Sequence, residues 1–340
     1  MESRRNGGAT LDKRNAGMKA RAVLVWLAFA VALAAGPVAQ AQDYPNRLIK
    51  LMHGFPPGGN VDVVARLLAN EMGKGLGQSI VVEGKPGQAG SLAAEAFAGT
   101  EPDGYTLLLV TGAHPATGAV YKKLKYRPVD DFAWISTASF YPFVICVRKD
   151  SELKTFSDLL RSARARPGGV TSGTAGLGSI AHMTTELISS LGGVQLLPVP
   201  YRGEAPAMTG LLSGDVNFVV ATSTLAVPHV RSGEVRALAI TGKTRWKDFP
   251  EIPTIAESGL PEFEVISWSG IAAPANTPKA IVDRLHAEIQ RTIAVPDVHG
   301  RLESFGAEVR GTTPAEMRAL VERQLALWTK VARQSSIQLD

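Results

Sequence analysis

Short aliphatic or β-branched runs alternate with helical patterns over residues 42–340, and this alternation constrains the fold more than any other feature. Such alternation is typical of βα units that build a mostly parallel sheet covered by helices. The expected strands are 48–52, 79–83, 106–111, 143–148, 170–172, 217–221, 236–241 and 265–273. The expected helices include 61–72, 155–165, 180–191 and a long amphipathic helix that starts at Thr313. The sequence therefore predicts the α/β class.

The 340 residues exceed the usual size of a single core, so two lobes are expected. Two extended segments, 138–148 and 264–273, flank a central block of about 120 residues, which is roughly one domain. A chain that crosses over and returns in this way makes two α/β lobes joined by two crossover strands. We predict a first lobe of 42–142 and 265–340 and a second lobe of 143–264.

Residues 1–41 have the layout of a secretory signal peptide. Basic residues precede an apolar run at 22–35, which is shorter than the roughly 18 residues that span a bilayer. Ala39-Gln40-Ala41 has the pattern of a signal-peptidase site, so cleavage is expected before Gln42. The alternative is a permanent N-terminal membrane anchor, but the run is short for that.

The formal net charge of +5 suggests a polyanionic partner, but its distribution does not. Residues 1–41 hold six of the 36 basic and two of the 31 acidic residues, which leaves 30 basic and 29 acidic residues in 42–340. At +1 and without basic runs, this part is not expected to bind nucleic acid. The single cysteine, Cys146, permits no internal disulfide and is expected to be a buried apolar residue.

The strongest local feature is the loop Phe55-Pro56-Pro57-Gly58-Gly59-Asn60-Val61-Asp62, between the first expected strand and its helix. Prolines stiffen such a loop, and glycines let backbone N–H groups face a ligand at a helix N-terminus. We interpret it as an anion cradle; a loop that only turns the chain is the alternative. Asp62 either orients the loop by accepting its amides or simply stabilises the helix start.

A second loop, Ser172-Gly173-Thr174-Ala175-Gly176-Leu177-Gly178-Ser179, has the same context in the central block and is followed by His182. It offers amides and hydroxyls without a fixed positive charge. Thr111-Gly112-Ala113-His114 is a similar but weaker strand-end loop. Two cradles, one in each lobe, suit a small carboxylate held between them. For His182, a contact to ligand or to its own loop and a structural hydrogen bond both remain open.

The sequence does not match the standard motifs of nucleotide-binding proteins or hydrolases. Gly242-Lys243-Thr244 lacks the first glycine of a P-loop, and Gly173, Gly176 and Gly178 do not have dinucleotide-site spacing. The rival interpretation is a secreted α/β hydrolase-like enzyme that acts on a small acid through Ser179, His182 and an unidentified acid. Because no nucleophile-base spacing is recognisable, we expect no catalytic residue, no enzyme activity, no metal and no cofactor.

A series of short motifs extends through almost all of 42–340 and carries a family resemblance. The motifs are Tyr44-Pro45, Phe55-Pro56-Pro57-Gly58-Gly59, Asp62, Ala65-Arg66, Lys85-Pro86-Gly87, Pro102-Asp103-Gly104-Tyr105-Thr106-Leu107-Leu108, Val199-Pro200-Tyr201-Arg202-Gly203-Glu204-Ala205-Pro206-Ala207, Arg236-Ala237-Leu238-Ala239, Pro253-Thr254-Ile255-Ala256-Glu257 and Trp268-Ser269-Gly270-Ile271-Ala272-Ala273-Pro274. In order and spacing they resemble the Bug family, the periplasmic substrate-binding receptors of tripartite tricarboxylate transporters.

The resemblance implies a type II periplasmic binding protein, or Venus flytrap, whose lobes close around a carboxylate. When the family's ligand-binding positions are transferred to this sequence, each lobe contributes one loop, here called a jaw, to the ligand site. The first jaw is Phe55, Gly58, Gly59 and Asp62, and the second jaw is Thr174, Gly178, Ser179 and His182. Thr111 and Gly112 form the floor of the site, and Tyr201 is a nearby wall. The implied function is to bind a small carboxylate-containing acid in the periplasm, either for delivery to transporter subunits in the membrane or for sensing. We expect the protein to be a monomer. Met52-His53-Gly54-Phe55 and Ala221-Thr222 depart from the family pattern, so the ligand cannot be carried over.

Overall fold

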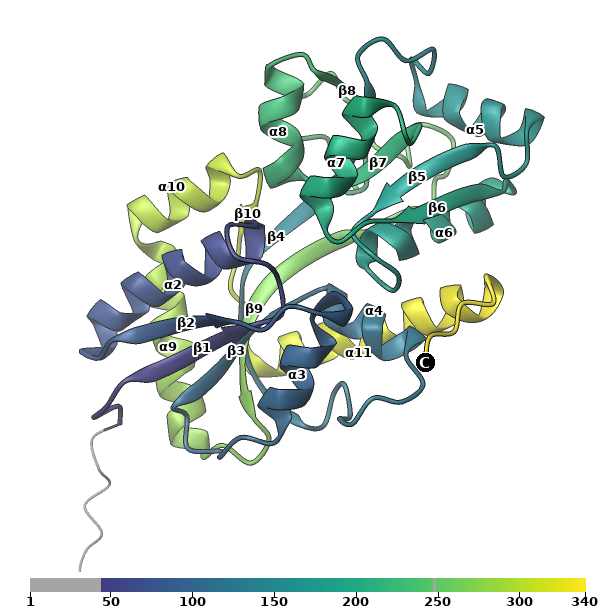
Figure 1. Ribbon diagram of the computed structural model, residues 1–340. Coiled ribbons are helices and arrows are strands. Elements are labelled where there is room, and N and C mark those ends of the chain that lie inside the picture. The colour runs from purple at the N-terminus through teal and green to yellow at the C-terminus, as the bar shows by residue number, and fades with distance from the viewer. Residues whose placement is uncertain (1–43, 247–248) are drawn as a thin grey trace, which may run out of the picture. The chain divides into compact units, whose positions relative to one another are not determined.

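The computed structural model describes residues 44–246 and 249–340, so the predicted signal peptide lies outside the described residues. The helices and strands of these described residues fall within Arg47–Asp340 (Figure 1). The strands are β1 (Ile49–His53), β2 (Ile80–Gly84), β3 (Thr106–Thr111), β4 (Phe132–Arg148), β5 (Val170–Thr174), β6 (Leu196–Pro200), β7 (Phe218–Thr222), β8 (Val235–Ile240), β9 (Ile266–Pro274) and β10 (Glu308–Val309). The helices are α2 (Asn60–Leu76), η1 (Gln88–Gly90), α3 (Ser91–Ala98), α4 (Ala113–Val120), α5 (Phe156–Ala165), α6 (Ile180–Gly192), α7 (Glu204–Ser213), α8 (Ser223–Arg231), α9 (Lys279–Ala294), α10 (Pro296–Ser304) and α11 (Pro314–Gln334).

The strands follow the order β2-β1-β3-β9-β4-β7-β5-β6, with β10 and β8 paired to β4. β1 runs parallel to β2 and β3, and β5 runs parallel to β6 and β7. Every pairing of β4 or β9 is antiparallel. The α/β class is confirmed, but the expectation of a mostly parallel sheet is wrong. The sheet is mixed because β4 and β9 enter as crossovers rather than through βα units.

The long strand β4 joins the two halves of the sheet. Its Phe132–Pro142 portion pairs with β9, whereas its Phe143–Arg148 portion pairs with β7 and β8. The buried hydroxyl of Thr241 fastens this switch point, since it accepts the amide of Phe143 at 2.7 Å and donates to the carbonyl of Val265 at 2.6 Å. Both predicted crossover segments are therefore tied together at one residue.

Local sequence signals place most helix ends correctly. Thr155 and Thr313 each cap a helix through a capping box, with Asp158 and Glu316 as the reciprocal acids. β6, β10 and the first part of β4 were not expected. β6 was not predicted because Pro198 and Pro200 normally argue against a strand. Among the described strands, however, β6 pairs only with β5, and an edge strand tolerates proline.

The C-terminal helix α11 contacts both halves of the molecule. Met317 and Val321 near its start pack in a core cluster with Phe97 and Trp268 of the first half. Trp328, Val331 and Ala332 near its end pack in a second cluster with α4, α6 and the second-half strands. Figure 1 shows this yellow helix alongside α4. The helix therefore packs on both halves rather than on one.

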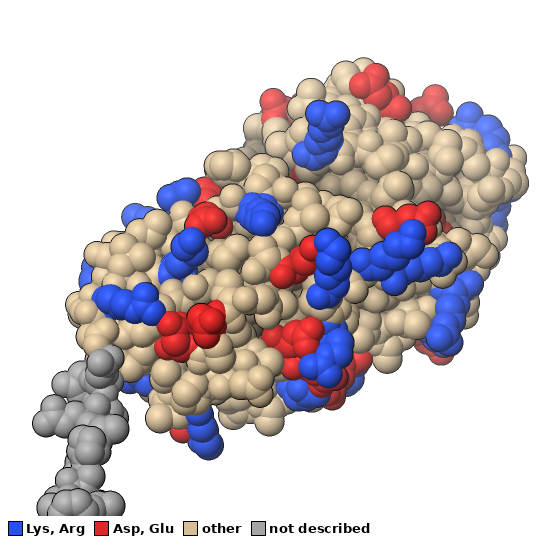
Figure 2. All heavy atoms as spheres, turned by 60° about the horizontal axis from the view of Figure 1, so that its bottom comes forward, with Lys and Arg blue, Asp and Glu red and all other residues tan. Residues whose placement is uncertain are grey.

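Charged side chains of both signs are interspersed on the face shown in Figure 2, with uncharged surface between them. This distribution agrees with the near-balanced charge of residues 42–340. No helix in the described part of the chain combines the length and the apolar character that a membrane crossing requires. Cys146 is fully buried and unpaired, as its sequence context predicts.

Candidate functional site

The first predicted jaw is organised around the carboxylate of Asp62, in the first turn of α2. Asp62 is 4% exposed and accepts hydrogen bonds from the Gly58 amide at 3.0 Å and from Arg66 Nε at 2.9 Å. Its Oδ1 lies 3.1 Å from Nε2 of His53, at the end of β1. The Arg66 bond is the main cause that lowers the pKa of Asp62 to about 2, so the carboxylate stays ionised at neutral pH. It fixes the loop that Phe55, Gly58 and Gly59 belong to.

His53 belongs to this jaw, although sequence reasoning noted it only as a departure from the family pattern. Its ring is fully buried, and Nδ1 lies 3.4 Å from the amide nitrogen of Phe55. Burial lowers the pKa of His53 despite the neighbouring Asp62. A neutral ring can donate from Nε2 to Asp62 and accept at Nδ1 from Phe55, so His53 orders both ends of the loop.

The second predicted jaw repeats this construction at the N-terminus of α6. Ser179 caps α6 by accepting the amide of His182 at 3.2 Å, and its hydroxyl donates to the carbonyl of Gly176 at 2.7 Å. Nδ1 of His182 accepts the amide of Gly178 at 3.1 Å. Burial lowers the pKa of His182, so the ring is neutral and suited to accept that bond. His182 contacts its own loop, which was one of the alternatives left open.

The two jaws share one local geometry. Gly58 and Gly178 both have positive φ, at 75° and 74°, a conformation that favours glycine. In each jaw the glycine amide donates to a side chain four residues later, in the first turn of the next helix: Asp62 in one and His182 in the other. These two amides are therefore engaged within the loops, and they shape the cradles rather than remain open to a ligand.

The predicted floor lies against the second jaw. Gly112 caps α4, and a Cβ placed on it would lie 2.8 Å from Cδ1 of Ile180, the first residue of α6, and 3.1 Å from Oγ of Ser267 on β9. The hydroxyl of Thr111 accepts the amide of Ala113 at 3.3 Å. Thr111 and Phe55 line one small cavity of about 20 Å³, which is enough for about one water molecule. The structure thus brings floor, first jaw and second jaw together.

Thr174 and Tyr201 lie where β5 and β6 end. The amide of Tyr201 donates to the carbonyl of Thr174 at 2.9 Å. The hydroxyl of Thr174 is fully buried and has no hydrogen-bond partner among the described residues, so it is available to a bound molecule. The ring of Tyr201 packs against Gly210 of α7, which directs it toward its own lobe.

Sequence reasoning named Glu204 only within a family motif and Thr222 only as a departure from the family pattern, and it did not predict that the two residues form a pair. Glu204 opens α7, directly after the end of β6, and its Oε2 accepts the hydroxyl of Thr222 at 2.7 Å. Burial raises the pKa of Glu204 to about 7. An acid at the first position of a helix that follows a strand was the available signal, because such a position lies at the edge of the sheet where loops meet.

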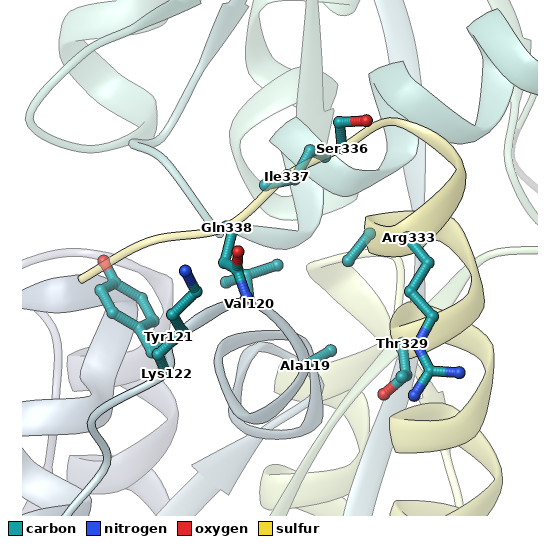
Figure 3. Close-up of a pocket in the computed structure, with 10 residues that line it drawn as sticks. Ala119, Val120, Tyr121, Lys122, Thr329, Arg333, Ser336, Ile337 and Gln338 are labelled. Carbon is teal, nitrogen blue, oxygen red and sulfur yellow. The ribbon is translucent and has the colours of Figure 1, made fainter.

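A larger cavity of about 530 Å³ is lined by none of the predicted site residues, although two of its lining residues, Val120 and Tyr121, lie against Gly178 of the second jaw (Figure 3). It is lined by the end of α4, the end of α11 and the C-terminal tail: Ala119, Val120, Tyr121, Lys122, Thr329, Ala332, Arg333, Ser336, Ile337 and Gln338. If cavity volume were the only criterion, the site would be placed at this cavity rather than at the two jaws. We place the candidate site at the jaws, because that is where the buried polar groups converge.

The arrangement of Ser179 and His182 does not suit a hydrolase. The serine hydroxyl donates to the carbonyl of Gly176 and accepts from the backbone of His182. The ring nitrogen that could serve as base accepts from Gly178, and the other lies 3.8 Å from Oε1 of Glu186. A nucleophile must have its hydroxyl within reach of a base, so the hydrolase alternative is not supported.

Two α/β lobes joined by crossover strands, with the candidate loops at helix N-termini of both, define a type II periplasmic binding protein. The chain belongs to the family described as the tripartite tricarboxylate transporter family receptor, whose model matches residues 64–337. The expected Bug-family resemblance is thereby confirmed. The family and its structural neighbours are substrate-binding receptors rather than enzymes.

Three solved structures illustrate the relationship. The R. palustris protein Rpa4515 with adipate has a TM-score of 0.81 and 34% identity, over 87% of this chain and 99% of that one. MatC (Rpa3494) from Rhodopseudomonas palustris with bound malate has a TM-score of 0.78 and 34% identity, over 85% and 99%. The periplasmic binding protein BugD has a TM-score of 0.80 and 33% identity, over 87% and 99%. These similarities confirm the two-lobe fold.

Proposed function

We propose that this protein is a periplasmic receptor that holds a small carboxylate between the two jaws. The observation that carries the proposal is the repeated loop geometry, in which Asp62 and His182 each fix a glycine amide at the start of a helix. Helix N-termini favour negative charge, so two such ends suit a carboxylate. The adipate and malate bound by two relatives support this ligand class.

The proposed lobes are 42–142 with 265–340, and 143–264. Their contacts include the hydroxyl of Thr224 on α8, which donates to Oδ1 of Asn60 on α2 at 3.2 Å. A ligand that touches both jaws favours the closed state by its differential contacts with the two lobes. We further propose that the closed receptor is a monomer, exported through the signal peptide at 1–41, that delivers its ligand to transporter subunits in the membrane.

The test uses Ser179→Ala and Gly59→Val with the probes adipate and malate in isothermal titration calorimetry. Ser179→Ala removes the α6 cap, and Gly59→Val places a branched side chain at the α2 cap, so each weakens binding by about tenfold. The matched control is Thr155→Ala. It removes a helix cap in the same proposed lobe as Ser179 but at α5, which carries neither jaw.

If adipate and malate do not bind, the calorimetry is repeated with the organic acid that mass spectrometry identifies in the purified protein. Affinity that is unchanged in both variants contradicts the two-jaw site. A protein that binds no organic acid at all contradicts the receptor function itself. Size-exclusion chromatography with light scattering tests the monomer separately.

A further inference from the structure

Glu204 stands where three parallel strands end. β5, β6 and β7 run parallel and finish at Thr174, Pro200 and Thr222, so the segments that follow them share one edge of the sheet. Glu204 follows β6, and its Oε2 is bound by the hydroxyl of Thr222 at the end of β7. The carboxyl group therefore lies on the same edge as the second jaw, which follows β5.

Contacts across the lobes connect this edge to the rest of the candidate site. The charge of Glu204 acts on Tyr141 of β4, whose hydroxyl is hydrogen-bonded to Ser267 of β9. Ser267 is also the neighbour of the Gly112 floor. Two residues beyond Thr222, Thr224 reaches Asn60 beside the first jaw. Glu204 thus lies near the floor through Tyr141 and Ser267, and the segment that holds its partner Thr222 continues to the first jaw through Thr224.

The carboxyl group of Glu204 lacks a compensating cation in the described part of the chain. Its polar partner there is Thr222, and burial without a neighbouring positive charge raises its pKa. The carboxylates of Asp62 and Glu288 are buried, whereas that of Glu204 is partly exposed, and Arg66 and Arg291 pair with the two buried ones. Desolvation of a carboxylate without a counter-ion favours uptake of a proton or binding of a cation from outside.

We propose that Glu204 receives the ammonium group of the ligand, so that the preferred ligand is an amino acid rather than a dicarboxylate. This inference rests on the proposed function, since the ligand carboxylate is held at the jaws. An ammonium group supplies three donors and the missing positive charge. A second carboxylate at the same place would be repelled by ionised Glu204, which gives selectivity against dicarboxylates.

The test compares matched ligands that differ only in the far group. The pairs are β-alanine and malonate, γ-aminobutyrate and succinate, δ-aminovalerate and glutarate, and ε-aminocaproate and adipate. Calorimetry is done with the full exported chain at pH 8. In the pair whose chain length gives the tightest binding, we expect the amino acid to bind more tightly than the dicarboxylate by about tenfold or more. Glu204→Gln removes the charge while its amide oxygen can still accept from Thr222.

In Glu204→Gln we expect amino-acid affinity to fall by about tenfold and dicarboxylate affinity to rise. Glu262→Gln is the matched control, an exposed glutamate of the second lobe that carries the same charge change. Between pH 8 and pH 6 the wild-type preference for the amino acid should shrink as Glu204 takes up a proton, whereas the variant should show no such trend. Tyr141, the other titratable group that faces Glu204, has a raised pKa and stays neutral throughout.

Preference for the dicarboxylate with an affinity that Glu204→Gln leaves unchanged overturns the assignment but leaves the receptor function intact. Failure of every carboxylate to bind, in wild type and variant alike, overturns the receptor function as well. Thermal unfolding of both variants establishes that each is folded, so a loss of amino-acid affinity in Glu204→Gln alone is attributable to the charge.

Discussion

Replacing Asp62 with asparagine tests the construction of the first jaw. The asparagine side chain keeps the size of Asp62 but loses the charge that attracts Arg66. Its NH₂ group would also face one of three hydrogen-bond donors: the Gly58 amide, Arg66 Nε and, with a neutral ring, His53 Nε2. We expect both the stability of the protein and the order of the loop to decrease.

The size of the effect follows from the pKa of Asp62. A fall from 3.8 to about 2 corresponds to about 2.4 kcal/mol of preferential stabilisation of the ionised form. The side chain of Arg66 is 60% exposed, so solvent screens part of that interaction, and we expect a loss of about 2 kcal/mol at pH 7. Because the folded pKa is lowered, this stabilisation is present above pH 3.8 and is lost as the pH falls toward 2.

The assay is urea unfolding followed by circular dichroism at pH 7 and at steps down to pH 3. The free-energy difference between wild type and Asp62→Asn should be about 2 kcal/mol at pH 7 and should shrink on acidification. Asp283→Asn is the matched control, because Asp283 forms an exposed ion pair with Lys279 worth less than about 1 kcal/mol. Equal stability of wild type and Asp62→Asn, or a difference that does not change with pH, would refute the reasoning.

Three further predictions concern the floor, the crossover and the cysteine. Gly112→Ala places a methyl group against Ile180 and should lower the free energy of unfolding by about 1 kcal/mol, measured by urea titration; unchanged stability would mean that this contact is loose. Thr241→Val leaves the amide of Phe143 unpaired and should lower it by about 2 kcal/mol, with Thr241→Ser restoring most of the loss. Cys146 is fully buried and burial raises its thiol pKa to about 12, so iodoacetamide at pH 8 should modify it only in urea; rapid labelling of the folded protein would contradict its burial.

Local features of the site could be predicted from the sequence because they depend on residues within one helical turn. Gly58 with Asp62, and Gly178 with His182, are each four residues apart, and the capping role of Ser179 involves its own first turn. The same holds for the capping box of Thr155. Backbone conformation and capping are decided by near neighbours, and the sequence displays near neighbours directly.

The tertiary structure decided which polar groups have a hydrogen-bond partner or an opposite charge beside them. In the sequence, His53 only follows the expected strand 48–52, and the folded structure is needed to show that its ring lies between Asp62 and Phe55. Glu204 and Thr222 are 18 residues apart, and their contact exists because β6 and β7 both lie beside β5. The edge position that permits β6 to contain prolines is likewise a property of the sheet.

The sequence by itself determined the α/β alternation, the two glycine loops and the family to which they belong. The structure decided that β4 and β9 run antiparallel to their neighbours, that α11 packs on both halves, and that the partly buried Glu204 has no paired cation among the described residues. The physical reason is that backbone preference acts over a few residues, whereas burial and charge compensation depend on groups that approach each other only when the chain is folded.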